Sequence, residues 1–188
     1  SKHMALVNRM GFNNPGSKNM QNALKRHYSR FGKPNIPLWV NLGKSKLTSN
    51  NDAHTDYSTT LKRLWKYADL FVVNVSSPNT PNLRDLQNKD QLAKIISCCM
   101  EVNAEQALLH ESKQKPILVK VAPDMTLQQL EQIVTVAMDT GCSGIVAINT
   151  TVLRTDEFEL DEKLAEAGGM SGKPLNEKST EFISYIYR

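Results

Sequence analysis

Four short apolar runs divide the chain. They are rich in β-branched or aromatic residues and are nearly continuous rather than alternating, a pattern typical of parallel strands covered on both faces. The runs occupy residues 37–41, 70–75, 116–121 and 144–149. We therefore predict four buried strands.

Helical periodicity fills the stretches between these runs. Residues 126–140 give the clearest pattern, because apolar residues recur at i, i+3 and i+4. Thr126 and Gln129 have the spacing of a capping box, and Gly141 stands where a C-cap glycine would. Helices are also predicted over 55–67, 89–110 and 177–187. The acidic stretch 153–167 is predicted to be an excursion from the regular structure, not a strand.

The alternation of strands and helices implies right-handed crossovers and a parallel sheet, so the fold class is α/β. An open doubly wound sheet and a (β/α) barrel both fit this order. Polar residues follow all four strands: Asn41 with Gly43-Lys44, Asn74 with Ser76-Ser77, Lys120 with Pro123-Asp124, and Asn149 with Thr150-Thr151. Barrel enzymes build their sites from several successive loops at the strand ends, whereas open sheets use one switch point. The barrel is favoured.

Only four strands are predicted, whereas a (β/α)8 TIM-type barrel has eight. Half a barrel would leave two open sheet edges and an uncovered inner face. Residues 1–188 are therefore interpreted as a partial barrel domain of about four parallel strands, with the remaining barrel strands expected before residue 1 and after residue 188.

The composition argues against nucleic-acid binding, a metal site and a membrane span. The 23 Lys and Arg face 19 Asp and Glu, for a formal charge of +4, and they are scattered, so nucleic acid is not an expected partner. The three cysteines and four histidines lack metal-ligand spacing, so no metal site is expected, and the unpaired thiols fit a reduced compartment. No apolar run approaches the roughly 20 residues that a membrane span needs.

The most informative segment is residues 74–81, Asn-Val-Ser-Ser-Pro-Asn-Thr-Pro, directly after a predicted strand. Its prolines stiffen the loop, and its amides offer both hydrogen-bond donors and acceptors. Taken alone, the composition is that of an ordinary polar turn.

This segment resembles the active-site loop of class 2 dihydroorotate dehydrogenases. Further motifs resemble that family in the family's order, over about residues 5–188. They are Asn8-Arg9-Met10-Gly11-Phe12-Asn13-Asn14, Val40-Asn41-Leu42-Gly43-Lys44, Leu118-Val119-Lys120-Val121-Ala122-Pro123-Asp124, Asn149-Thr150-Thr151 and Gly168-Gly169-Met170-Ser171-Gly172-Lys173-Pro174-Leu175.

The resemblance implies roles for individual residues. Ser77 matches the catalytic base, and serine rather than cysteine at this position selects the quinone-reducing class. Positions matching substrate contacts are Asn8, Arg9, Met10, Gly11, Phe12, Asn74, Asn79, Asn149 and Thr150. Positions matching contacts to flavin mononucleotide (FMN) are Asn41, Asn74, Lys120, Ile148 and Gly172; some members have threonine where Ile148 stands.

The implied reaction is the FMN-dependent oxidation of dihydroorotate to orotate, with quinone as the electron acceptor, in de novo pyrimidine biosynthesis. A serine base needs a dry site, so a lid over the Ser77 loop is expected, with Leu83 and Arg84 as candidates. Lys120 would stabilise negative charge on the reduced flavin, or would be a strand-end lysine that reaches solvent.

Two alternatives stay open. A (β/α)-barrel lyase or aldolase would use Lys120 to form a Schiff base. A catalytically incomplete barrel fragment would keep substrate-side residues without bound flavin. The quinone site and a membrane-contacting N-terminal segment are expected outside this chain. Class 2 members work at the mitochondrial or the bacterial inner membrane, and the loops favour the mitochondrial one.

Overall fold

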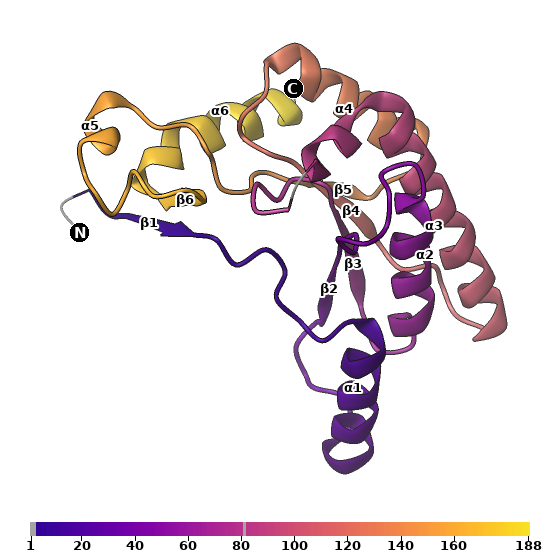
Figure 1. Ribbon diagram of the computed structural model, residues 1–188. Coiled ribbons are helices and arrows are strands. Elements are labelled where there is room, and N and C mark those ends of the chain that lie inside the picture. Colours follow the sequence, from indigo (N-terminus) through magenta and orange to yellow (C-terminus); the bar gives the residue numbers. More distant parts are fainter. Residues whose placement is uncertain (1–2, 81) are drawn as a thin grey trace.

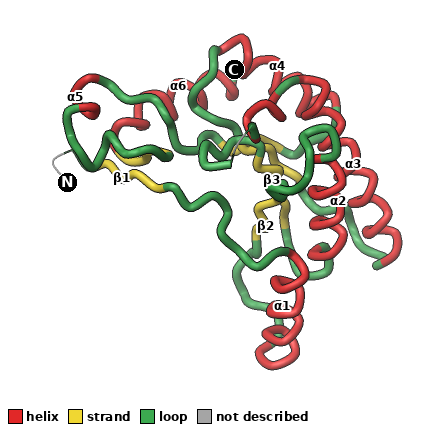
Figure 2. Tube along the Cα trace, viewed as in Figure 1, coloured by secondary structure: helices red, strands yellow, loops and turns green. Residues whose placement is uncertain are grey.

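A computed structural model describes residues 3–80 and 82–188, and it is built on a four-stranded parallel sheet (Figures 1 and 2). The strand order is β2-β3-β4-β5, which follows the order along the chain. The strands are β2 (Trp39–Leu42), β3 (Leu70–Asn74), β4 (Ile117–Lys120) and β5 (Gly144–Val146). All four predicted strands and their parallel arrangement are confirmed, although β5 ends three residues before the predicted end.

Helices connect the strands and form a layer on one side of the sheet (Figure 1). They are α2 (Ala53–Leu64), α3 (Lys89–Leu109) and α4 (Leu127–Asp139), each close to its predicted bounds. The predicted capping box is confirmed: the Thr126 hydroxyl accepts a hydrogen bond from the Gln129 N–H, and the Gln129 side chain accepts one from the Thr126 N–H. Gly141 has φ +78°, as a glycine after a helix end permits.

Strand alternation separates two faces of the sheet. Phe71 and Val73 of β3, like Ile117 and Val119 of β4, are buried in the hydrophobic core together with α2, α3 and α4. The residues between them point to the opposite face, because successive side chains in a strand alternate. The face turned away from α2, α3 and α4 therefore carries the polar strand residues.

A second sheet forms an arm that extends from the main body (Figure 1). It consists of β1 (Ala5–Asn8) paired antiparallel with β6 (Gly169–Gly172), and the sequence pattern did not predict it. The stretch 153–167 contains the short helix α5 (Asp156–Glu159) and no strand, as expected. After β6, the 3-10 turn η2 (Lys173–Leu175) leads into α6 (Asn176–Tyr187), which is anchored by the fully buried Phe182.

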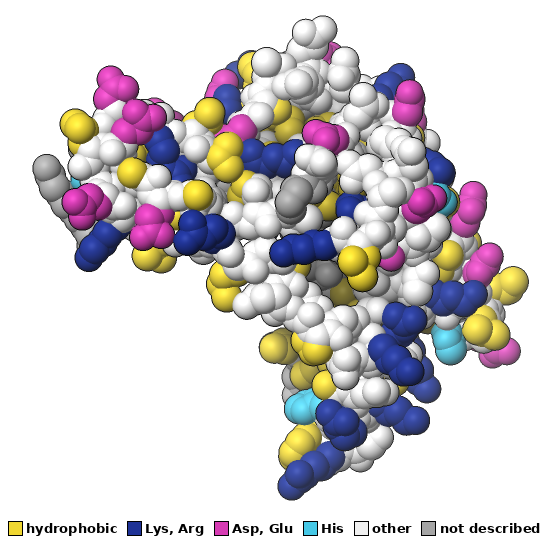
Figure 3. All heavy atoms as spheres, viewed as in Figure 1, with side chains coloured by type: hydrophobic (Ala, Val, Ile, Leu, Met, Phe, Trp, Pro, Cys, Tyr) yellow, Lys and Arg dark blue, Asp and Glu magenta, His cyan; other side chains and the backbone are white. Residues whose placement is uncertain are grey.

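Helix α1 (Ser17–Phe31) was also not predicted, and none of its residues is buried. In Figure 3, Lys and Arg side chains gather over the lower part of the molecule, where α1 lies, whereas Asp and Glu gather around α5 on the arm. Over the residues that the structure describes, no helix has the length and apolar character that crossing a bilayer requires.

Candidate active site

The parallel register brings three predicted cofactor residues onto the helix-free face of the sheet. Asn74 of β3 is paired directly with Lys120 of β4, and Asn41 of β2 is paired with Val72, two residues before Asn74. In-register neighbours in parallel strands point to the same side. Asn41, Asn74 and Lys120 therefore share one surface near the C-terminal ends of the strands, as the barrel interpretation predicted.

Lys120 is half-buried, and this burial lowers the pKa of its ammonium. Within residues 3–80 and 82–188, the ammonium has neither a hydrogen bond nor an ion pair. A partly desolvated cation without a partner gains from a negative charge placed beside it. The helix-free face thus has a specific place for an anionic or electron-rich group.

Ser76 joins the loops that follow β3 and β5. The Asn74 side-chain oxygen accepts hydrogen bonds from the Ser76 N–H (3.2 Å) and hydroxyl (2.9 Å). The Asn149 amide nitrogen donates to the same hydroxyl at 3.0 Å. The Tyr57 hydroxyl, on the buried side of α2, donates to the Asn74 carbonyl at 2.9 Å. These bonds fix both amides at the strand ends.

Ser77 lies next to this junction and is only 7% exposed. Its hydroxyl oxygen accepts a hydrogen bond from the Asn79 N–H at 3.3 Å. The Asn79 side chain donates to the carbonyl and side-chain oxygens of Asn8, at 3.0 and 3.2 Å, so the arm meets the loop here. The hydroxyl of Thr80 is buried without a partner in the described structure. Pro81, which completes the predicted loop, lies outside the described residues.

Asn149 and Thr150 follow β5. They lie at the same edge of the sheet, which is formed by the loops after β3 and β5 and is called the rim below. The Thr150 N–H donates to the Asn149 side-chain oxygen at 2.8 Å. Gly169 of the arm packs directly on Thr150: a Cβ added at this glycine would lie 2.7 Å from the Thr150 Cβ. Sequence reasoning gave Gly169 no such role, because the contact joins segments that are separated in the chain.

Four other predicted residues lie at the edge of this cluster. Phe12 packs beside Gly43, and a Cβ at Gly11 would lie 2.9 Å from the Asn79 carbonyl. Met10 is 63% exposed, and Arg9 is exposed, with its guanidinium 3.8 Å from Glu166. A cavity of about 790 Å³ beside β2 is lined by Met10, Gly11, Phe12, Asn41 and Thr80, among others.

The last two predicted residues do not join the cluster through their side chains. Ile148 is partly buried against the hydrophobic core, which leaves only its main chain for the rim. Gly172 is exposed in β6, and a Cβ there would lie 3.1 Å from the Ala5 Cα. The close approach that this glycine permits is therefore to β1 in the arm.

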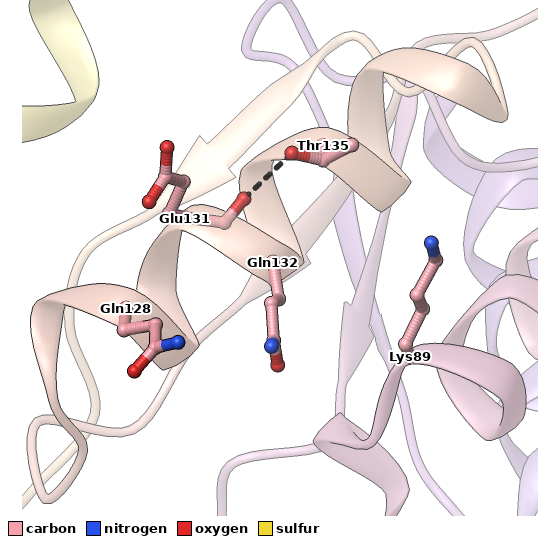
Figure 4. Close-up of a pocket in the computed structure, with 5 residues that line it drawn as sticks. All are labelled: Lys89, Gln128, Glu131, Gln132 and Thr135. Carbon is pink, nitrogen blue, oxygen red and sulfur yellow. Dashed lines mark hydrogen bonds between the residues drawn. The ribbon is translucent and has the colours of Figure 1, made fainter.

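The structure gives no support for a lid formed by Leu83 and Arg84, the two residues proposed for it. Leu83 is fully buried in the core, and Arg84 is bound to several loops at once. Both belong to the 3-10 turn η1 (Leu83–Gln87). A second hollow, of about 260 Å³, lies between the start of α3 and α4, and Figure 4 shows the residues around it. None of the predicted site residues lines this hollow.

Comparison with known proteins agrees with this arrangement. The family model described as Dihydroorotate dehydrogenase matches residues 1–188. The chain belongs to the dihydroorotate dehydrogenase family. A "Dihydroorotate dehydrogenase (quinone)" of Anaeromyxobacter sp. (strain K) is 44% identical over 188 residues, covering 99% of this chain and 49% of the relative. The protein of that name from Chloroflexus aurantiacus is 42% identical over 185 residues, covering 98% and 50%.

Solved structures give the same result. The ligand-free dihydroorotate dehydrogenase of Eimeria tenella superposes with a TM-score of 0.86 at 34% identity, covering 99% of this chain and 55% of that one. Its complex with ferulenol gives 0.85 at 33% identity. This dihydroorotate dehydrogenase chain thus folds as about half of a (β/α) barrel, and it spans about half the length of the curated relatives it matches.

Proposed function

We propose that this chain supplies the base and most of the substrate contacts of a quinone-linked dihydroorotate dehydrogenase, which oxidises dihydroorotate to orotate in pyrimidine biosynthesis. One observation carries the proposal: the buried Ser77 follows β3 three residues after Asn74, which is paired in register with Lys120 on the helix-free face. The quinone-dependent relatives support the electron acceptor.

FMN is the cofactor that fits this face. Asn41, Asn74 and Lys120 would hold it with their side chains, Ile148 with its main chain, and Gly172 from the end of β6 that pairs with Ala5. When bound, the flavin accepts the hydride that leaves the substrate ring. The unpartnered Lys120 ammonium is the strongest sign of fit, because burial lowers its pKa and nearby negative charge would restore the charged form.

The asparagines suit the substrate, a flat ring with carbonyls, N–H groups and a carboxylate. One amide side chain both donates and accepts, so Asn8, Asn79 and Asn149 can match both kinds of ring group. Thr150 and the main chain of residues 10–12 complete this side of the pocket, and the exposed Arg9 is a candidate for the carboxylate. The unpartnered Thr80 hydroxyl nearby is free to bind a ligand or water.

Ser77 is the proposed base that removes a proton from a substrate ring carbon. A serine hydroxyl gives up its own proton only where negative charge on the oxygen is stabilised. The Asn79 N–H, which donates to the Ser77 oxygen, supplies such stabilisation. Burial of Ser77 excludes bulk water from the transfer.

Quinone and membrane contacts are proposed for the whole protein rather than for these 188 residues. The curated relatives are bacterial, which favours the bacterial inner membrane as the location. They give the mitochondrial expectation no support.

The decisive experiment uses a protein extended at both ends to the length of the relatives. Its visible spectrum is recorded, and dihydroorotate is added under anaerobic conditions. We expect a flavin band that bleaches in the wild type and in Ser58→Ala, a control on α2 whose partly exposed hydroxyl donates to the Thr55 carbonyl, but at least about 100-fold more slowly in Ser77→Ala. A flavin band that dihydroorotate does not reduce would indicate another substrate.

Lys120→Met separates the proposal from the lyase alternative. We expect flavin reduction to slow sharply, because the cation that stabilises the reduced cofactor is lost, whereas Lys62→Met on the outer surface keeps the wild-type rate. Absence of flavin in the extended protein, together with borohydride trapping of substrate on Lys120, would overturn the proposal in favour of a Schiff-base lyase.

A further inference from the structure

The turn η1 is rigidly attached to the body of the protein. Leu83 and Leu86, at either side of Arg84, are fully buried in the core. The Gln87 side chain accepts a hydrogen bond from the Ala122 N–H at 3.0 Å and donates to the Arg84 carbonyl at 3.3 Å. The backbone of Arg84 is therefore fixed to the core and to the loop after β4.

The Arg84 guanidinium reaches three successive strand-end loops. Its Nε donates to the Ser76 carbonyl at 3.3 Å, and its Nη2 donates to the Thr150 carbonyl at 3.0 Å. Its Nη1 is paired with the Asp124 carboxylate at 2.6 Å. These acceptors follow β3, β5 and β4 respectively, so one side chain joins all three loops.

Asp124 extends this connection along the loop after β5. Its carboxylate accepts hydrogen bonds from the Thr151 hydroxyl and from the Val152 N–H, the latter at 3.0 Å. The Arg84 and Asp124 side chains are only 22% and 10% exposed, so solvent and salt screen this pair less than a surface pair. The pair therefore fixes residues 150–152 as well as Ser76.

We propose that Arg84 is a positioning residue that sets the placement of Ser77 relative to Asn149 and Thr150. The inference rests on the proposed function, in which Ser77 is the base and the other two residues contact the substrate. Arg84 binds the carbonyl of Ser76, which directly precedes Ser77, and the carbonyl of Thr150 itself. A guanidinium donates in several fixed directions in one plane, which a lysine ammonium on a flexible stem does not reproduce.

The first test does not depend on catalysis. Hydrogen–deuterium exchange is measured on the extended protein as wild type, Arg84→Met, Arg84→Lys and Lys62→Met, a control with an exposed cation. We expect exchange in residues 75–80 and 149–153 to rise at least about tenfold in Arg84→Met, and less in Arg84→Lys, with α3 unchanged. Unchanged exchange in either segment would overturn the proposal. If Arg84→Met does not fold, Arg84→Lys and Asp124→Asn give the same decision.

The second test connects the loops to the reaction. We expect the limiting rate of anaerobic flavin reduction to fall about 100-fold in Arg84→Met, because small misplacements of reacting groups cost about that much. In a Ser77→Ala background the same change should cost less than about tenfold, because Arg84 acts largely through Ser77. Equal losses in both backgrounds would refute the positioning role. If dihydroorotate fails to reduce the wild-type flavin, the proposed function falls, and the exchange measurement still decides the role of Arg84.

Discussion

Gly169→Ala tests the contact between the arm and the rim of the candidate site. The new Cβ would lie 2.7 Å from the Thr150 Cβ, closer still to the Thr150 hydroxyl, and 3.0 Å from Pro78 Cγ. Carbon atoms normally pack about 3.5–4.0 Å apart, so the two Cβ atoms must separate by at least about 0.8 Å. A change of the Thr150 rotamer does not relieve this, because the Cβ itself is too close.

The backbone around this contact resists such a shift. Thr151 and Met170, the neighbours of the two residues, exchange main-chain hydrogen bonds of 3.0 and 2.7 Å. The Thr150 carbonyl is held by Arg84. Overpacking in such places costs about 1–3 kcal/mol, and the lower chain entropy of alanine in the unfolded state returns about 0.4–1 kcal/mol. We expect a net loss of about 1–2 kcal/mol in the free energy of unfolding.

Urea unfolding, followed by the fluorescence of the protein's two tryptophans, measures this loss. Gly43→Ala is the matched control, because neither glycine has a positive φ and a Cβ at Gly43 meets the Phe12 ring at an ordinary 3.5 Å. That variant should stay within about 1 kcal/mol of the wild type. Equal stability of the two variants would show that Gly169 does not pack on Thr150 as described.

Three further changes probe the scaffold. Thr126→Ala removes the α4 N-cap and should lower the free energy of unfolding by about 1 kcal/mol in urea titrations; no loss would mean that the cap does not form. Asn103→Ala leaves the buried indole N–H of Trp65 and the main-chain N–H and carbonyl of Lys115 without partners. We expect the free energy of unfolding to fall by about 3 kcal/mol, with a shift in tryptophan fluorescence. A loss below about 1 kcal/mol would contradict this. Burial acts to raise the pKa of Asp69, but hydrogen bonds, chiefly from Lys33, outweigh it and hold the pKa below its usual value. The stability advantage of wild type over Asp69→Asn should therefore be constant above about pH 5 and vanish as pH falls through and below about 3.9. A stability advantage that does not depend on pH would refute this.

Local sequence pattern was sufficient for the parallel sheet and for the three helices that cover it. The helices bury one face each and the strands are nearly continuous apolar runs, so the hydrophobic pattern predicts both, and Thr126 marks the start of α4. Helix α1 repeats apolar side chains at Met20, Leu24 and Tyr28, a helical spacing that the sequence analysis did not use, and none of its residues is buried. Strand β6 is Gly169-Met170-Ser171-Gly172, which contains no apolar run, and the pairing of β1 with β6 depends on a contact between distant parts of the chain.

The site was predictable where one loop carries several of its residues. Asn74, Ser77 and Asn79 belong to one segment, and parallel strands place the following loops at the same edge. The pairing of Arg84 with Asp124 was not predictable, because the two residues are 40 positions apart and an arginine in a polar turn has many possible partners. The position of Gly172 was also not predictable, because a glycine's close neighbour is known only once the fold is known.

The two sheets impose different demands on the order of folding. Each strand of the parallel sheet pairs with the strand before it, so this sheet can grow by one unit at a time as the chain is synthesised. The arm closes a loop between residues more than 160 positions apart, such as Leu6 and Ser171, and the entropy of closing so long a loop opposes early pairing. Strand β1 must therefore wait for its partner, which lies more than 160 residues later in the chain.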